Sequence, residues 1–166
     1  ASLTGHLVLS TLHTNSAPET ITRLMDMGLD RFTVADALAG VLAQRLAKAL
    51  CTDCRESYRG TPQERQQMAI SYGKESFEER LGGGEFMLWR APGCESCGHT
   101  GYKGRVALHE LIVVNDLVKE AILGKRSFNE IRETQGPGAT TLRQDGIEKA
   151  MAGHTDMLQV LLEGSR

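Results

Sequence analysis

The 166-residue sequence is poor in aromatic side chains and lacks both a dominant charge and a long hydrophobic run. Its 19 Lys and Arg against 21 Asp and Glu give a formal net charge of −2, with no Lys/Arg-rich block, which argues against a nucleic-acid-binding protein. Because no run of about 20 apolar residues is present, we expect no transmembrane segment. An apolar fraction of 40% with so little net charge argues against disorder and is ordinary for one globular domain or two small ones.

The first fifty residues are expected to form a strand, a loop and two helices. The apolar run at residues 7–12 has the length of a buried strand. Residues 16–19 combine an N-cap serine, a first-turn proline and a glutamate three residues after the cap, which predicts a helix ending near Gly28. Apolar residues at helical spacing predict a second helix over residues 33–50. This order indicates the edge of an α/β layer structure.

The later residues predict a strand followed by several helices. A short helix is expected from residue 62 to about residue 71, and the segment at residues 105–114, which is rich in Val, Leu and Ile, is typical of a strand. Four helical patterns follow, at residues 116–123, 127–134, 140–151 and 155–162, the last with Thr155 as its N-cap. Glycine-containing breaks separate these patterns at 124, 136–138 and 153.

All four cysteines fall into two matched pairs. Cys51 and Cys54 form one Cys-x-x-Cys knuckle, Cys94 and Cys97 form the other, and 39 residues lie between the pairs. Two such knuckles brought together supply four thiolates in a tetrahedron, the closed geometry of a structural Zn²⁺ site. Because four thiolates leave no open position for water, a catalytic zinc is not expected.

Disulfides, a redox site and an empty metal site stay open as alternatives for the cysteines. Two disulfides would need an oxidising compartment, for which the sequence gives no indication. A redox Cys-x-x-Cys normally occurs once, near the start of a helix, and not as two matched pairs. Structural zinc is therefore the favoured interpretation.

A second candidate site is the histidine-bearing segment at residues 4–15. His6 and His13 flank the predicted strand, and residues 11–14 would place hydroxyl and imidazole groups at its carboxyl end. Ligands usually bind at that edge of an open α/β sheet. On the residues alone, however, a histidine near a strand end is more often an ordinary loop residue.

Several motifs, in order along the chain, resemble the secretion ATPases that drive type II secretion and type IV pilus assembly. Residues 4–15 resemble the family's His box, and residues 40–46 followed by the first cysteine pair resemble its entry into a tetracysteine element. The second cysteine pair followed by residues 100–105 resembles the return from that element, and residues 141–149 with 153–155 resemble the closing helices. The similarity covers nearly the whole chain, with residues 60–92 the least characteristic part.

The resemblance also indicates what is missing. Family members bind ATP through a P-loop, and this sequence contains no Gly-x-x-x-x-Gly-Lys-[Ser/Thr] pattern. The chain also begins at Ala1 without an initiator Met. We therefore expect the C-terminal portion of a RecA-like P-loop NTPase, starting just past its Walker B region and inactive alone, with ATP and Mg²⁺ bound only by the intact parent.

The resemblance implies three parts and a role for each. Residues 1–50 would be the C-terminal part of the RecA-like core, 51–105 an inserted tetracysteine zinc module, and 106–166 a strand with a C-terminal helical subdomain. His6 and His13 would sense and stabilise the nucleotide γ-phosphate, with Thr11 and Thr14 as possible hydroxyl partners.

The implied parent is a cytoplasmic homo-hexamer, peripherally associated with the inner membrane through a platform protein of the secretion or pilus machine. If neighbouring strands of the parent are missing, apolar residues 7–9 would be exposed. The alternatives are a stand-alone zinc-bound protein-interaction module and a retraction motor of the same superfamily; the resemblance argues against the latter, because those motors usually lack the tetracysteine element. Type II secretion and pilus assembly are not separated by these motifs.

Overall fold

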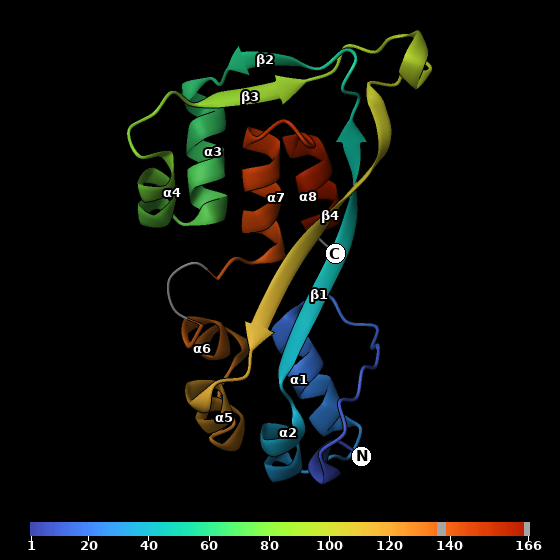
Figure 1. Cartoon of the computed structure of the whole chain (residues 1–166). Helices are drawn as coiled ribbons and strands as arrows, with labels where there is room; N and C mark the ends of the chain where they lie inside the picture. The colour runs from blue at the N-terminus through green and yellow to red at the C-terminus, as the bar shows by residue number, and fades with distance from the viewer. Residues whose placement is uncertain (136–138, 165–166) are drawn as a thin grey trace. The chain divides into compact units, whose positions relative to one another are not determined.

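The computed structural model describes residues 1–135 and 139–164, which are divided between two compact units. Unit 1 takes in Ala1–Gln44 and His109–Thr140, and unit 2 takes in Arg45–Leu108 and Thr141–Arg166. Strands β1 (Gly40–Leu50) and β4 (Tyr102–Val113) pair in a two-stranded sheet, and each contributes residues to both units (Figure 1). The predicted mixture of helices and strands is confirmed.

Unit 1 is mainly helical. Its elements besides the two strands are η1 (Ser2–Thr4), α1 (Ala17–Asp26), α2 (Arg31–Ala37), α5 (Asp116–Leu123) and α6 (Phe128–Glu133). Helix α2 packs on α5, and α1 packs on α6. Fully buried apolar side chains of these helices include Ile21, Val118, Ile122 and Ile131.

Helix α1 begins where the sequence predicts. Ser16 occupies the N-cap, and its side chain accepts a hydrogen bond from the Glu19 backbone N–H at 3.3 Å. Pro18 lies in the first turn, where its missing N–H costs no hydrogen bond. The helix ends at Asp26, and Gly28 follows with φ of +93°, a conformation that favours glycine.

The strand predicted over residues 7–12 is wrong for this structure. In the described part of the chain, strands occur only in the β1–β4 and β2–β3 pairs, and residues 6–15 are neither strand nor helix. Leu7 is 87% exposed, Val8 52% and Leu9 89%, which confirms the expected exposure of these residues. A run of consecutive apolar residues becomes a strand when neighbours pair with its backbone and cover both faces, and no described strand does so here.

The helix predicted over residues 33–50 is also wrong. Helix α2 ends at Ala37, and Gly40–Leu50 forms β1. Burial along β1 largely alternates: Val41 and Ala43 are buried, whereas Leu42 is 60% exposed. Pairing with β4 therefore overrides the helical spacing, and a Cβ at Gly40 would lie 3.1 Å from the Ile112 carbonyl oxygen, so the strands approach closely there.

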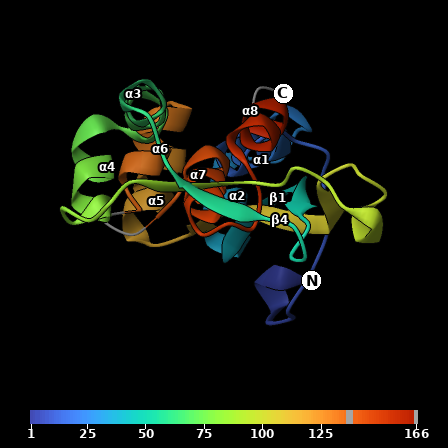
Figure 2. The same cartoon turned by 90° about the horizontal axis from the view of Figure 1, so that it is seen from above.

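Among the described residues, unit 2 contains, besides its parts of β1 and β4, two antiparallel strands, four α-helices and the short 3-10 helix η2 (Glu95–Cys97). Strands β2 (Glu56–Arg59) and β3 (Met87–Arg90) pair antiparallel, in the register Glu56↔Arg90 to Arg59↔Met87. The helices are α3 (Pro62–Tyr72), α4 (Lys74–Leu81), α7 (Leu142–Met151) and α8 (Met157–Gly164). The two strands are called the β2–β3 hairpin below, although α3 and α4 lie between them in the sequence. Strand β3 contacts α7, and Figure 2 shows the hairpin running across that helix.

One apolar cluster holds unit 2 together. Its buried members come from the hairpin and the helices: Met68, Ala69, Tyr72, Phe77, Phe86, Leu88, Ile147, Ala150 and Val160. Phe77 is central, with ring centroids 5.9 Å from Tyr72 and 6.0 Å from Phe86. The hairpin is thus fixed to the helices by side-chain burial and not only by its own ladder.

Several predicted elements of the later chain are confirmed, and others were missed. Helix α3, strand β4 and helices α5 to α8 lie close to their predicted ranges, whereas the β2–β3 hairpin and α4 were not predicted. The expected N-cap at Thr155 is wrong: its hydroxyl donates to the Lys48 carbonyl oxygen, and the Asp156 carboxylate instead accepts from the Gln159 N–H. The predicted break at residues 136–138 lies outside the described residues.

Candidate metal centre and histidine segment

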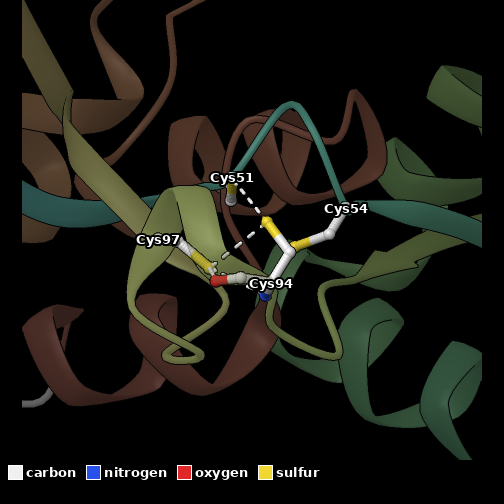
Figure 3. A group of neighbouring side chains, drawn as sticks. All are labelled: Cys51, Cys54, Cys94 and Cys97. Carbon is white, nitrogen blue, oxygen red and sulfur yellow. Dashed lines mark hydrogen bonds between the residues drawn. The ribbon is translucent and has the colours of Figure 1, made fainter.

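The four cysteine sulfurs converge on one point in unit 2. Cys51 directly follows β1, Cys54 lies in the turn after it, Cys94 is the N-cap of η2, and Cys97 is the last residue of η2 (Figure 3). All four sulfurs lie within 4.8 Å of one another, with Cys51 Sγ 4.0 Å and Cys97 Sγ 3.8 Å from Cys94 Sγ. A tetrahedron with Zn–S bonds of about 2.3 Å has edges of about 3.8 Å. The four sulfur ligands and their spacing therefore fit a metal ion bound by four thiolates.

The same distances argue against disulfides. A disulfide joins its sulfurs at about 2.0 Å, and all four cysteines here are free. A redox pair is also a poor fit, because the two knuckles present their sulfurs to one common centre. The structure thus contains four nearby cysteines that are consistent with a zinc module. Zinc is named as the metal because four thiolates are its usual ligands in structural sites.

Backbone hydrogen bonds shape the second knuckle. The N–H groups of Cys94 and Gly101 donate to Cys97 Sγ at 3.2 and 3.3 Å, and the Cys51 N–H donates to the Gly101 carbonyl oxygen at 2.9 Å. Gly93 has φ of +100°, and a Cβ there would lie 2.5 Å from the His99 carbonyl oxygen. Only glycine fits that turn without distortion.

The surroundings shift the pKa values of the Cys97 and Cys54 thiols in opposite directions. The Cys94 N–H is the main group that lowers the pKa of the Cys97 thiol, to about 6, because it stabilises the thiolate. Desolvation raises the pKa of the Cys54 thiol to about 12. Cys97 is therefore ionised at neutral pH without help, whereas Cys54 needs a bound cation to lose its proton.

A polar bridge that the sequence did not predict joins the two knuckles. Asp53 stands between the first two cysteines and Ser96 between the last two. The Ser96 hydroxyl donates to Asp53 Oδ2 at 2.5 Å, and Lys103 Nζ donates to Ser96 Oγ at 2.8 Å. The Ser96 hydrogen bond and, next, the Lys103 charge lower the pKa of the Asp53 carboxyl. Hydrogen bonds around the ligands of a metal site help to hold those ligands in position.

A second unpredicted contact ties the cysteine module to α7. The Arg55 guanidinium lies 5.1 Å from the Trp89 ring centroid and donates to the Gly153 carbonyl oxygen at 2.5 Å. Trp89 Nε1 donates to the Met151 carbonyl oxygen at 3.1 Å. A Cβ on Gly153 would lie 2.6 Å from the Trp89 ring, so glycine is required for this approach. The only tryptophan of the sequence is thus a structural link between the cysteine module and the helices.

The histidine segment of unit 1 is open by comparison. His6, Thr11 and His13 are exposed, and Thr14 is half-buried. His6 Nδ1 lies 3.2 Å from Thr4 Oγ1, and Thr14 Oγ1 lies 2.6 Å from Thr20 Oγ1. Among the residues described, His6, Thr11, His13 and Thr14 share no hydrogen bond with one another. The imidazoles are accessible to a ligand, but this structure does not gather them into a pocket.

Within residues 1–135 and 139–164, none of the helices is both long enough and apolar enough to cross a bilayer.

Comparison with known proteins gives one consistent result. The chain is 44% identical over 162 residues to the "Type IV pilus assembly ATPase PilB" of Thermus thermophilus. It is 43% identical over 161 residues to the "Type II secretion system protein E" of Aeromonas hydrophila, and 40% identical over 161 residues to the "Type II secretion system ATPase E" of Vibrio cholerae. Each match covers 97% of this chain but only 17% of the Thermus protein and 30% of each of the others.

The family description "Type II/IV secretion system protein" also matches, over residues 1–162. That match includes the histidine segment, both cysteine pairs and helices α7 and α8 up to residue 162. The resemblance noted in the sequence is thereby confirmed, and the chain belongs to the type II/IV secretion system protein family.

Proposed function

We propose that this chain is the C-terminal portion of a RecA-like ATPase that powers type II secretion or type IV pilus assembly. The observation that carries the proposal is its identity of 40–44%, over 97% of its residues, to relatives named as ATPases of these two machines. Because the chain spans less than a third of those relatives, the activity belongs to a longer parent protein. Identities of 44% and 43% to a pilus protein and a secretion protein keep both machines within the proposal.

The nucleotide chemistry of the parent would be divided between its parts. A P-loop, which this sequence lacks, supplies the backbone N–H groups and lysine that cradle the phosphates and the Ser/Thr hydroxyl that binds Mg²⁺. His6 and His13 would then approach the γ-phosphate, donating hydrogen bonds to the charge that develops during phosphoryl transfer. Thr11 and Thr14 would supply hydroxyl groups beside them. The exposure of both imidazoles supports this assignment.

The cysteine centre would hold a structural zinc ion. Cys51, Cys54, Cys94 and Cys97 would be its four ligands, and no position would remain for water or substrate. Bound zinc supplies a rigid cross-link between the two knuckles. Residues 51–105 would then act as a stiffened zinc module, with residues 1–50 as the core segment and residues 106–166 as the strand and helical part of the parent.

The partners follow from the same family assignment. The parent would assemble as a homo-hexamer in the cytoplasm and reach the inner membrane through a platform protein. We propose that the zinc module transmits motion to that platform protein. A stand-alone zinc-bound interaction module is the alternative, and the named ATPase relatives disfavour it.

Activity of the full-length protein tests the proposal. It should hydrolyse ATP, the 166-residue chain alone should not, and His13→Ala in the full-length protein should lower kcat by roughly 100-fold. Deleting residues 51–104 should leave hydrolysis while stopping secretion or pilus assembly. Hydrolysis by the isolated chain, or full assembly with the deletion variant, would contradict the proposal.

A further inference from the structure

Glu110 is a buried carboxylate in unit 1 that the proposed chemistry does not use. It lies on β4 and is only 3% exposed. A charge removed from water at this depth is tolerated only when other groups replace its hydration. The partners of Glu110 therefore indicate what the residue holds in place.

Its two oxygens bind two different helices. Oε1 accepts a hydrogen bond from Arg132 Nε on α6 at 2.8 Å, and Oε2 accepts one from the Ala17 backbone N–H at 3.2 Å. Ala17 is the first residue of α1, so the carboxylate faces the positive end of that helix. One side chain of β4 thus fixes the start of α1 and is itself held by α6.

The start of α1 in turn fixes the end of the histidine segment. Thr14 Oγ1 lies 2.6 Å from Thr20 Oγ1, and the Asn15 N–H donates to Glu19 Oε2 at 2.8 Å. Ser16 caps the helix through the Glu19 N–H. Residues 14–16 are therefore attached to the first turns of α1, and His13 is the next residue toward the N-terminus.

We propose that Glu110 is a positioning residue for His13, acting through the N-terminus of α1, with Arg132 as its counter-ion. The inference rests on the proposed role of His13 at the nucleotide. Glu110 touches no reacting atom; it sets where the anchored end of the histidine segment lies. Loss of its charge loosens the first turn of α1 and leaves His13 without a fixed approach to its target.

The first test is kinetic and uses the full-length ATPase. Glu110→Gln keeps the size of the side chain but loses the charge that binds Arg132. It should lower kcat by about 10–100-fold, the cost of a small misplacement of a catalytic group, with KM for ATP unchanged. Arg132→Gln leaves the buried Glu110 carboxylate without its counter-ion, so it should lower kcat at least as much as Glu110→Gln. Arg132→Lys, which keeps a positive charge beside Glu110 but loses the Nε hydrogen bond, should lower kcat less, and it keeps the test valid if the other two variants do not fold. Glu148→Gln, which removes the ion pair with Arg80 in unit 2, is the matched control and should leave kcat unchanged.

The second test measures the contact without activity. Hydrogen exchange of peptides spanning residues 13–20 of the full-length protein should accelerate about tenfold or more in Glu110→Gln and Arg132→Gln, and not in Glu148→Gln. Unchanged exchange in a folded variant, or unchanged kcat, would overturn the inference. If the wild-type protein hydrolyses no ATP, the proposed function fails, whereas the exchange experiment still decides whether Glu110 holds α1.

Discussion

The cysteine centre and the histidine segment were both recognisable in the sequence, yet the structure treats them differently. The four cysteines converge within 4.8 Å, with hydrogen bonds from backbone N–H groups and polar side chains around them. The histidine segment is exposed and forms no strand, although its apolar residues are typical of a buried one. All four cysteine ligands and their hydrogen-bond partners lie within the described residues, so this site is assembled in the structure, whereas the proposed role of the histidine segment also depends on a nucleotide and on a P-loop that this sequence does not contain.

The largest expected effect concerns the metal ligands. Cys51→Ser, at a fully buried position, should reduce bound zinc from about one ion per chain to almost none. A structural zinc ion contributes on the order of 10 kcal/mol or more of binding free energy, most of which requires all four thiolates. Elemental analysis with thiol titration under denaturing conditions checks this, and Ser57→Ala on the neighbouring strand is the control. A wild-type chain that yields no metal and no free thiols would mean disulfides instead.

Removing the metal should affect unit 2 and spare unit 1. A strong chelator should shift the Trp89 emission to longer wavelength, because opening of the knuckles frees Arg55 and Gly153 from the indole ring. Hydrogen exchange in α5, in unit 1, should not change. The Cys51→Ser variant should show the shifted emission from the start and no response to chelator. If the chelator also accelerated hydrogen exchange in α5, the metal would stabilise both units and the prediction would be wrong.

A smaller effect is expected in the protons released on metal binding. At pH 8 the Cys97 thiol, with a pKa of about 6, is already ionised, whereas the Cys54 thiol, with a pKa of about 12, is protonated. Zinc binding should therefore release at least one proton but fewer than four. Below pH 6, Cys97 gains a proton that zinc must then displace, so the released count should rise. Calorimetry in buffers of different ionisation enthalpy measures this count; a value of four at pH 8 would be incompatible with the low pKa of Cys97.

The smallest effect is expected in the histidine segment. Leu9→Ala should change the free energy of unfolding of the 166-residue chain by no more than about 0.5 kcal/mol, because Leu9 is 89% exposed. Ile21→Ala, at a fully buried site of the same unit, should cost about 2–5 kcal/mol. In the full-length protein proposed above, Leu9→Ala should become clearly destabilising if strands of that protein cover this segment. Denaturant unfolding of both proteins tests the prediction, and equal costs in the two contexts would contradict it.

Helix starts were the most predictable part of the fold because their signals are local. Ser16 with Glu19 and Thr141 with Gln144 place donors and acceptors three residues apart, and both pairs form cap bonds. The error over residues 33–50 has a non-local cause. The spacing of the apolar residues in this segment is compatible with both a helix and a strand. Residues 40–50 form a strand because they pair with β4, which lies more than fifty residues later in the sequence. The β2–β3 hairpin was missed for the same reason, since α3 and α4 separate its strands.

The candidate metal ligands and most helix starts could be predicted from the residues alone, because each depends on residue type at fixed spacing; the family was predicted from the resemblance of several motifs taken in order. Three-dimensional packing was needed to make Gly40–Leu50 a strand and to bring Asp53, Ser96 and Lys103 together across the knuckles. Packing also placed Glu110 between Arg132 and Ala17. These contacts join residues that are distant in sequence. Their formation depends on burial and pairing between separate elements, which local spacing does not encode.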